Sequence, residues 1–549
     1  MKKMSYFKKK GDSYVIFTAA GLIVSLAMVA LIMAIILLKG LGFFWPSDLV
    51  EVKLKDGKEY LGEQWAEDIK YENDNDGNRI EHEEIQLKIG NRDLYGLDFT
   101  WLSKNEIKQT DRPKDATAFE RLGYGNFYGF IQSLNIGNEQ FKYEGEQSND
   151  KVEDAHDIAV ENRSKIKDLE DEINELNAPL VNIQREISLL QINDDKIPEE
   201  QAKLEKFQKE EHALTEKITP EYNKLNKKLE NIYLENQDIY LNLKTADNQE
   251  KKLLLADVVR FYQPNEMNVF EKGWLYAKKF WEFVSDEPRE SNTEGGVFPA
   301  IFGTVMMVLL MSIAVVPFGV LAAIYLNEYA KQGAIIRMIR LSVNNLAGVP
   351  SIVYGIFGLG FFVYALGGTI DQLFFSSSLP EPTFGTGGIL WASLTLALLT
   401  LPVVIVATEE GILAVPRANK EGALALGSTR WQMIRKIVLP NAMPGILTGL
   451  ILAISRGAGE VAPLMITGVV KLAPSLPLDM SFPFLHLDRK FMHLGFHIYD
   501  VGFQSPNVEA AKPMVYTTAL LLIVIVVLLN LLAIYIRNRL RKKYKTSVF

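Results

Sequence analysis

The sequence contains no cysteine, and it has only six histidines among 549 residues. The absence of cysteine excludes disulfide bonds, thiol catalysis and cysteine metal sites. The HExxH and GxSxG motifs of metalloproteases and serine hydrolases are absent as well. Three histidines, His486, His493 and His497, fall in one stretch, where they could bind a metal ion but are more commonly solvated loop residues. The composition therefore indicates no catalytic residues, and we expect no metal and no cofactor bound by this chain.

Charged residues are missing from long parts of the chain. An uncharged stretch runs from Val15 to Leu38, whereas about 40–295 is dense in Glu, Asp, Lys and Asn. A run of about 20 apolar residues is what a bilayer requires. Five further runs of this kind cover 297–326, about 341–370, 388–408, 441–470 (which includes two charged residues) and 513–536. The sequence predicts an all-α polytopic membrane protein with six transmembrane helices and a large soluble α+β insert.

The first apolar stretch follows a cluster of lysines within residues 2–10. A signal peptide has a similar plan, but its apolar core is usually about 7–15 residues long and ends in a cleavage site of small residues. The stretch here is longer and ends Leu37-Leu38-Lys39. We therefore expect an uncleaved first span at 15–38.

Basic residues decide the expected orientation, because cytoplasmic loops are enriched in Lys and Arg. Both ends of the chain are basic, as are loops 327–340 and 409–440, whereas loop 371–387 has no basic residue and loop 471–512 is balanced. We therefore expect both termini in the cytoplasm and the insert outside. Because these clusters flank apolar spans, they indicate contact with membrane lipid and no nucleic-acid partner. The expected order is a cytoplasmic amino terminus (1–14), the first span (15–38), an extracytoplasmic insert (39–296), a domain of five spans (297–536) with the cytoplasmic loop 409–440, and a basic tail (537–549).

The insert begins with strand patterns. Two runs alternate apolar with charged residues next to glycine-containing turns: Val50, Val52 and Leu54 before Asp56-Gly57, and Ile85, Leu87 and Ile89 before Gly90-Asn91. Such alternation predicts half-buried strands, and Asp-Gly is typical of a hairpin turn. We expect a small β-rich module over 48–105. The aromatic-rich stretch 106–150 shows no assignable pattern.

The middle of the insert has a heptad period. Apolar residues recur at alternating steps of three and four: Ile166, Leu169, Ile173, Leu176, Leu180, Ile183, Ile187 and Leu190. A second run follows: Leu204, Phe207, Leu214, Ile218, Tyr222, Leu225, Leu229 and Ile232. These runs predict an antiparallel coiled-coil hairpin within 155–250, with a kink or weak point at Pro179. The pattern leaves open whether the hairpin closes on itself or on another chain, and whether it serves packing or regulation.

A polar segment between two apolar runs, 421–440, carries a spaced motif. It reads E-x-A-x3-G and, after nine residues, I-x-L-P: Glu421, Ala423, Gly427, Ile437, Leu439 and Pro440. Ala423 and Gly427 are four apart, so in a helix they would share one face that another backbone could approach, and Pro440 should end the segment. At these residues the chain resembles the EAA loop of ABC-transporter permeases, a short helix that docks on the partner ATPase. The alternative is an amphipathic interfacial helix whose spacing is accidental.

This chain lacks a nucleotide-binding lysine. Gly422 to Thr429 reads G-x4-G-S-T, one lysine short of a P-loop, and no apolar strand precedes it. We therefore expect the chain to be no enzyme, with ATP and Mg²⁺ bound by a separate subunit.

One pair of opposite charges lies inside an apolar run. Arg456 and Glu460 are four apart in SRGAGEVAPL, a spacing that permits pairing. A charge in mid-membrane costs about 2.5–3.5 kcal/mol on insertion scales, so such charges usually face a water path or a partner. Arginine suits bidentate contact with a phosphate oxyanion, and the neighbouring Gly457 and Gly459 permit close approach or a broken helix. The alternative is a buried ion pair that only fixes helix packing.

Three stretches are similar to the phosphate-specific ABC permeases of the PstA type: 344–360, 401–434 and 456–468. The resemblance covers about 297–470 and implies an ABC type I importer permease fold in a bacterial inner membrane. It also implies a PstC-type permease partner, a PstB-type ATPase dimer and a PstS-type periplasmic phosphate-binding protein. Arg456 falls where the family carries a basic residue associated with phosphate passage. Relatives commonly have an arginine where this chain has Val406, a departure that bears on the choice between phosphate and another oxyanion. The insert has no counterpart in the compact members of the family.

Two functions from different classes follow. The first is the transmembrane permease subunit of an ATP-driven phosphate importer, with Arg456 and Glu460 on the substrate pathway and 421–440 as the contact to the ATPase. The second is an envelope sensor or scaffold that uses the coiled-coil insert and only relays signals through permease-like spans. Deleting 155–250 separates them, because a transporter should still import whereas a sensor should lose its output.

Overall fold

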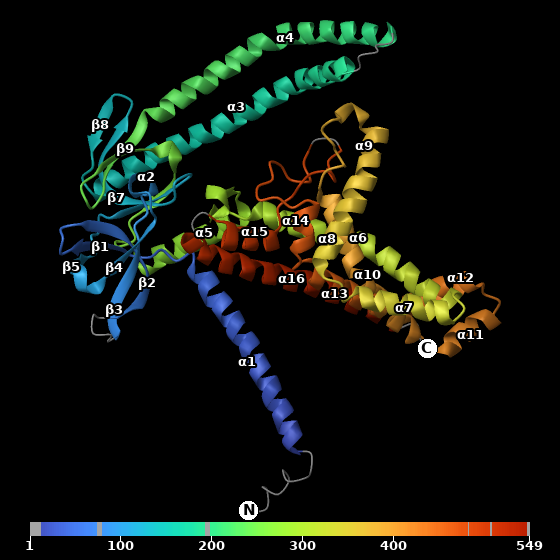
Figure 1. Cartoon of the computed structure of the whole chain (residues 1–549). Helices are drawn as coiled ribbons and strands as arrows, with labels where there is room; N and C mark the ends of the chain where they lie inside the picture. The colour runs from blue at the N-terminus through green and yellow to red at the C-terminus, as the bar shows by residue number, and fades with distance from the viewer. Residues whose placement is uncertain (1–11, 74–78, 193–197, 481–482, 506–507, 546–549) are drawn as a thin grey trace, which may run out of the picture. The chain divides into compact units, whose positions relative to one another are not determined.

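A computed structural model describes residues 12–73, 79–192, 198–480, 483–505 and 508–545. The chain divides into two compact units (Figure 1). One, here called the membrane unit, comprises Met1–Phe44 and Trp281–Phe549, and the other, the insert unit, comprises Trp45–Phe280. The insert unit thus interrupts the membrane unit soon after its first helix.

Six helices among the described residues are long and apolar enough to cross a membrane, as predicted. These spans are Tyr14–Gly42, Phe298–Tyr329, Ser351–Phe374, Ile389–Leu413, Arg430–Gly457 and Val508–Leu540. The helices of the membrane unit are α1 (Asp12–Gly42), α6 (Phe298–Ile324), α7 (Ala334–Leu346), α8 (Ser351–Phe357), α9 (Gly368–Phe374), α10 (Ile389–Leu413), α11 (Arg417–Ala425), α12 (Arg430–Met433), α13 (Leu439–Gly457), α14 (Ala462–Thr467), α15 (Leu494–Tyr499) and α16 (Val508–Lys545). Wider π-helical turns extend or join several of them: Tyr325–Tyr329, Gly358–Gly367, Ile434–Val438 and Asp500–Gln504.

The third span begins later than the apolar run 341–370 predicts. Residues 341–346 belong to the separate helix α7, and the span starts at Ser351. Pro350 explains the break, because proline has no backbone N–H and restricts the residue before it to extended conformations. The fifth span also differs from the predicted 441–470, since its helix begins at Arg430 and ends at Gly457.

α10 is the most buried of the spans and packs between α6 and α13. Glycines let the α10 and α13 backbones approach closely, since a Cβ on Gly445 would lie 2.6 Å from the Cα of Gly411. Close backbone approach through small residues is the usual packing of helices in membranes, where lipid gives little hydrophobic drive for association. Two clusters of buried apolar side chains fill the space between these helices.

The insert unit contains two sheets with the same strand order. The first is β4-β3-β2-β1-β5, and the second is β10-β9-β7-β6-β11, with β8 added beside β7. The strands are β1 (Leu49–Leu54), β2 (Glu59–Asn73), β3 (Arg79–Lys88), β4 (Phe99–Ser103), β5 (Ile107–Asp111), β6 (Thr117–Arg121), β7 (Phe127–Ile136), β8 (Glu139–Lys142), β9 (Ile239–Lys244), β10 (Glu250–Leu254) and β11 (Val258–Tyr262). In both sheets a 3₁₀ turn precedes the last strand, which pairs antiparallel with the first. The insert therefore holds two modules of one topology.

The predicted β module is too short. Strands form over 48–105 as expected, and Gly57 makes the β1–β2 turn at φ 91°. However, the stretch 106–150, for which the sequence showed no pattern, supplies β5 to β8. The second module is hard to see because β7 and β9, which are neighbours in the sheet, are separated by about a hundred residues of chain.

Two long helices, α3 (Glu146–Ile192) and α4 (Pro198–Gln237), fill that separation and run antiparallel (Figure 1). Side-chain bonds from Gln184 to Glu211 and from Tyr233 to Glu170 fix their direction. The predicted apolar positions are buried or half-buried along both helices, except Tyr222, which is 36% exposed. The two helices contact each other along these positions, and α3 continues through Pro179. The coiled coil itself stays a prediction. Its helices begin at 146 and end at 237, so the last part of the predicted range 155–250 is strand.

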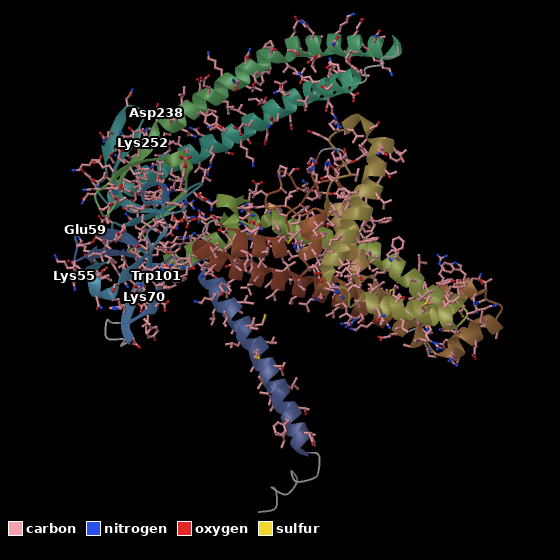
Figure 2. The ribbon with its side chains drawn as sticks, in the orientation of Figure 1. Lys55, Glu59, Lys70, Trp101, Asp238 and Lys252 are labelled. Atoms are coloured by element: carbon pink, nitrogen blue, oxygen red, sulfur yellow. The ribbon has the colours of Figure 1, made fainter. Side chains whose placement is uncertain are left out.

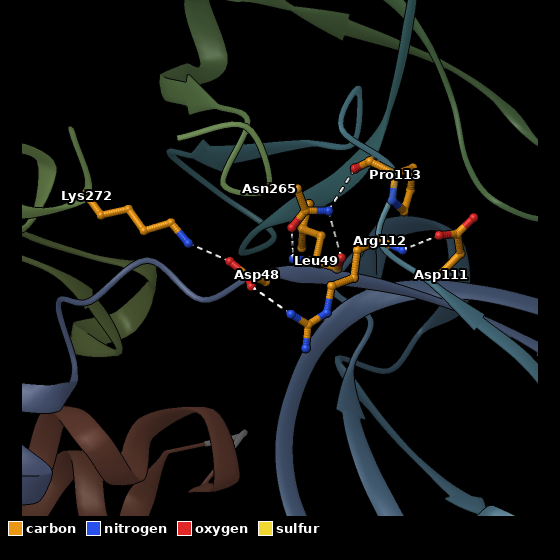
Figure 3. A network of polar contacts seen from close by, with 7 residues as sticks. All are labelled: Asp48, Leu49, Asp111, Arg112, Pro113, Asn265 and Lys272. Carbon is orange, nitrogen blue, oxygen red and sulfur yellow. Dashed lines mark hydrogen bonds and ion pairs between the residues drawn. The ribbon is translucent and has the colours of Figure 1, made fainter. Parts of the chain in front are cut away.

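Polar contacts join the two modules. The side chain of Asn91 donates to the Tyr128 carbonyl at 2.9 Å and accepts from the Tyr128 N–H at 2.7 Å, and both residues are buried. Asn265 likewise pairs with both backbone groups of Leu49 and donates to the Pro113 carbonyl at 2.7 Å (Figure 3). The modules are therefore held in one unit, whose outer surface carries charged side chains such as Lys55, Lys70 and Lys252 (Figure 2). The remaining elements of the chain are α2 (Arg92–Tyr95), α5 (Val269–Ser285), β12 (Pro288–Arg289) and β13 (Glu294–Gly295).

Candidate coupling and translocation sites

The segment 421–440 consists of two helices joined by a tight turn. α11 ends at Ala425, and Gly427 adopts φ 83°, the left-handed conformation that favours glycine. The Ser428 N–H donates to the Ala423 carbonyl at 3.1 Å and the Gly427 N–H to the Leu424 carbonyl at 3.0 Å. These two bonds form a Schellman motif, which satisfies carbonyls at the helix end.

The spacing predicted that Gly427 and Ala423 share one helical face, and this prediction is wrong. It lies beyond the helix, and nothing approaches within 4 Å of where its Cβ would be. Its role is conformational, because the turn needs a positive φ. Ala423 is half-buried and packs on the core cluster below the segment, so it faces the protein.

Pro440 does not end the segment, which corrects a second expectation. A capping box at Thr429 and Gln432 starts a new helix at Arg430, and this helix continues as α13 to Gly457. Pro440 lies in the first turn of α13, directly after the π-helical turn Ile434–Val438. Proline lacks an N–H and is tolerated in a first turn, and the wider turn before it accommodates the change in hydrogen bonding. Ile437, Leu439 and Pro440 are half-buried.

The outward surface of this turn is apolar at its centre and basic around it. Leu426 is 90% exposed, Trp431 51% and Leu424 45%. Glu421 is exposed, and so are the basic residues Arg417, Arg430, Arg435 and Lys436. We call this surface, residues 417–436, the coupling turn. The motif spacing missed its apolar centre, although three large apolar residues in a polar segment were a visible signal.

Ion pairs tie the coupling turn to the spans. Lys420 of α11 bonds Glu328, in the π-helical turn after α6, at 2.6 Å, and their side chains are 20% and 12% exposed. Arg340 of α7 lies 3.3 Å from Glu409 of α10, which also accepts from Asn327 at 3.1 Å. Four elements are thereby linked: α11, the π-helical turn after α6, α7 and α10. These pairs could not be predicted from the sequence, because their members lie far apart in the chain.

Arg456 and Glu460 lie where a helix breaks. Arg456 is in the last turn of α13, whereas Glu460 follows its end, and their nearest charged atoms are 3.9 Å apart. That distance is at the outer limit of a salt bridge, and the side chains are 31% and 22% exposed. The chain resumes as α14 at Ala462. The guanidinium therefore makes only a loose ion pair among the described residues, which leaves most of its donors available.

The glycines beside this pair act differently. A Cβ on Gly457 would lie 2.6 Å from the Met311 sulfur, so Gly457 permits close packing of α13 against α6, whereas Gly459 has open space around it. Val406 is half-buried in α10. Because Gly411 faces Gly445 and Val404 faces Gly449 in antiparallel fashion, Val406 lies roughly two helical turns, or ~12 Å, along the bundle from the level of Arg456.

His486, His493 and His497, in the loop before the last span, were expected to be solvated, and they are not. His493 and His497 are buried, and His486 pairs with Asp479 at 3.0 Å. His493 caps α15 by accepting the Gly495 N–H through Nδ1 at 3.1 Å. Burial lowers the pKa of His493 to about 3, and burial with nearby Lys471 lowers the pKa of His497 to about 4. Within the described ranges, no group of three His, Cys, Asp or Glu side chains could hold a metal ion.

Comparison with known proteins identifies relatives of the membrane unit. The family model described as binding-protein-dependent transport system inner membrane component matches residues 315–545. The chain is 33% identical over 271 residues to phosphate transport system permease protein PstA 1 of Mycobacterium tuberculosis (strain CDC 1551 / Oshkosh), which covers 49% of this chain and 80% of that protein. It is 33% identical over 251 residues to the PstA permease of Yersinia pestis, covering 46% and 75%. A solved structure of the MetNI methionine ABC transporter is 18% identical and covers 48% of this chain and 98% of that chain, but its TM-score of 0.31 is too low to carry a structural argument.

Proposed function

The chain belongs to the binding-protein-dependent transport system inner membrane components, and from this we propose that it is the membrane-spanning permease subunit of an ATP-driven phosphate importer. Its relatives of at least 30% identity include proteins named phosphate transport system permease PstA. The observation that supports the coupling role is the coupling turn. Its Leu426 and Trp431 side chains are exposed to solvent, while the Lys420–Glu328 ion pair holds the turn to the spans.

The coupling turn suits a protein partner. Tryptophan and arginine are enriched among the residues that contribute most binding energy at protein interfaces, and the exposed leucines beside Trp431 add apolar area to the same surface. In this proposal the partner is a PstB-type ATPase dimer, which binds ATP and Mg²⁺. When the ATPase closes, it displaces the turn, and Lys420 with Glu328 passes the displacement to α6.

Phosphate passage uses Arg456 in this proposal. Its guanidinium is half-buried and only loosely paired with Glu460, so an oxyanion can compete for its donors. Arginine binds phosphate oxygens in a bidentate manner. Glu460 holds the guanidinium between transits and keeps the buried charge compensated.

The assembly and its orientation follow from the same reasoning. The family and the six apolar helices together support a multi-pass protein of the inner membrane. We propose that both termini and the coupling turn are cytoplasmic, where ATP is available, and that the insert unit is periplasmic. A PstC-type permease would complete the pathway, and a PstS-type binding protein would deliver phosphate.

The test is phosphate-dependent ATP hydrolysis and phosphate uptake by the complex reconstituted in proteoliposomes. Arg456→Gln should abolish uptake and leave assembly with the ATPase intact, whereas Arg539→Gln in the exposed basic end of α16 should leave both unchanged. Equal uptake by Arg456→Gln would reject the role of Arg456. Equal stimulation by sulfate and phosphate would reject phosphate as the specific cargo, and the variant Val406→Arg then shows whether that position controls the choice.

A further inference from the structure

Helix α5 has the reverse of the usual amphipathic arrangement. A helix on a water-exposed surface normally turns its apolar face to the protein and its lysines to solvent. In α5, Lys272 and Lys279 lie on the face toward the insert unit, whereas Phe270, Trp274 and Trp281 lie on the outward face.

The two inward lysines are fully engaged. Lys272 bonds Asp48 at 2.5 Å, and Asp48 also pairs with Arg112 at 3.2 Å (Figure 3). Lys279 bonds Glu120 at 2.5 Å and the Tyr262 hydroxyl at 3.0 Å. Burial acts to lower the pKa of Lys279, but the Glu120 carboxylate outweighs it and raises that pKa above its ordinary value. These ion pairs fix the rotation of α5 about its axis, so its opposite face is exposed away from the insert unit.

The outward face is a stripe of large aromatic side chains. Phe270 is 90% exposed, Trp274 76% and Trp281 69%. Their spacing of four and seven residues, with Ala277 between, keeps them on one side of the helix. Covering a side chain of this size is worth about 1.5–3 kcal/mol relative to leaving it in water. A stripe of three such residues therefore indicates a surface that is covered in the working protein.

The carboxyl end of α5 lies where two spans end. Phe283 is 2% exposed, and its ring packs on Phe44 at 5.3 Å, two residues after the first span ends at Gly42. The Phe283 carbonyl accepts the Val297 N–H at 2.8 Å, immediately before the second span begins at Phe298. The last turn of α5 is thus held at the level where the chain enters and leaves the membrane. Trp and aromatic residues are enriched at that level because their rings suit the headgroup region.

An open groove of about 620 Å³ runs beside the stripe. The groove is lined by Tyr262, Met267, Asn268, Phe270, Glu271, Trp274, Leu275 and Lys278. Most of this lining is apolar, which suits the acyl chain of a phospholipid. Of the two charged groups, the Lys278 ammonium can pair with a lipid phosphate, whereas the Glu271 carboxylate accepts hydrogen bonds from Asn268.

We propose that α5 is an interfacial helix that lies in the membrane surface on the side of the insert, with Phe270, Trp274 and Trp281 inserted among lipids and a phospholipid in the groove. The helix then anchors the insert unit to the bilayer in addition to the two covalent connections. Lipid is the occupant because the stripe continues from the ends of two membrane spans.

The absence of cysteine makes the test direct. Single cysteines are placed at Ala277→Cys, on the stripe, and at Tyr124→Cys, a 62% exposed position elsewhere in the insert unit. Each full-length variant is labelled with a nitroxide and reconstituted in phosphatidylethanolamine–phosphatidylglycerol vesicles. Electron paramagnetic resonance then measures collision of the label with oxygen, which concentrates in lipid, and with a water-soluble nickel chelate.

The label at 277 should collide with oxygen severalfold more, relative to nickel, than the label at 124. Phe270→Cys gives a second position on the stripe in case the first disturbs the helix, and circular dichroism checks that both fold. Equal nickel accessibility at 277 and 124 would overturn the proposal, because the stripe would then be in water. Shielding from both reagents, in vesicles and in detergent alike, would also overturn it, since it would show a protein contact.

Discussion

Two exposed apolar surfaces of this chain, the coupling turn and the outward stripe of α5, differ in where their charges lie. The coupling turn surrounds Leu426 and Trp431 with exposed arginines. The α5 stripe has two of its lysines on the opposite face, paired with Asp48 and Glu120. A protein partner can pair with charges around an apolar centre, whereas the apolar part of a bilayer cannot. The position of the charges therefore distinguishes a docking surface from an anchoring surface.

Introducing a charge at the centre of each surface should produce the largest and most different effects. Leu426→Asp should weaken binding of the ATPase ~30-fold, because losing a central hot spot of an interface costs about 2 kcal/mol or more. Trp274→Asp should leave ATPase binding unchanged, and it should make α5 more accessible to the water-soluble nickel chelate in vesicles. Affinity of the reconstituted permease for the ATPase is the readout. If both variants bound the ATPase equally well, the distinction between the surfaces would fail.

The shape of the coupling turn should matter nearly as much as its chemistry. Gly427→Val forces a β-branched residue into φ 83°, which is strained for any residue other than glycine. We expect transport-coupled ATP hydrolysis to fall about tenfold, corresponding to ~1.4 kcal/mol. Gly422→Ala in α11 is the control, because a Cβ there meets nothing within 4 Å. Unaltered coupled hydrolysis by Gly427→Val would show that the turn is dispensable.

A response of this chain to mild acid should come from its buried histidines. The pKa of His493 is lowered by burial to about 3 in the folded protein and is about 6.5 when unfolded. The free energy of unfolding is therefore highest above pH 6.5. It decreases as the pH falls from 6.5 toward 3, because in this range the unfolded state binds the proton and the folded state does not. At pH 5.5 the loss is about 1.4 kcal/mol.

Hydrogen exchange of residues 494–504, corrected for intrinsic rates, measures this loss. His493→Asn keeps a side-chain acceptor for the start of α15 but cannot titrate, so its pH dependence should be flatter. An identical pH profile in the variant would rule out His493 as the titrating group.

The ion pair behind the coupling turn should give the smallest effect. Lys420→Met leaves Glu328 without its cation, and a double-mutant cycle with Glu328→Gln should yield a coupling energy of about 1 kcal/mol. Lys227→Met, at an exposed lysine of α4, should change the free energy of unfolding by less than about 0.5 kcal/mol. Thermal unfolding in detergent measures both. Additive single effects would mean that the pair does not connect α11 to the π-helical turn after α6.

The six spans and the two long helices of the insert were predictable because both have strong compositional or periodic signals. Long uncharged runs predicted the spans, and the heptad spacing predicted helices where α3 and α4 lie, whereas their coiled-coil packing stays a prediction. Predictions from single residues were wrong where one residue type fits two local structures. Gly427 could either line a helix face or turn the chain, and Pro440 could either end a helix or occupy its first turn. Spacing alone does not separate these alternatives, whereas backbone dihedrals do.

The second β module and the ion pairs of the coupling turn could not be predicted, because they join residues far apart in the chain. β7 pairs with β9 across the whole α3–α4 hairpin, and Lys420 reaches back to Glu328. Such long-range contacts produce no periodic pattern of residues in the sequence. The inverted face of α5 was also missed, since Lys272 and Lys279 resemble solvent-exposed lysines until Asp48 and Glu120 are seen beside them.

The most direct test of the account is a photo-crosslinker placed at Leu426 in membranes that contain the assembled complex. We expect it to capture the ATPase subunit, and we expect a cysteine at the same position to resist a membrane-impermeant reagent added from outside the cell. Labelling of that cysteine from outside, or crosslinks to lipid alone, would contradict the claim that this turn receives the work of ATP hydrolysis.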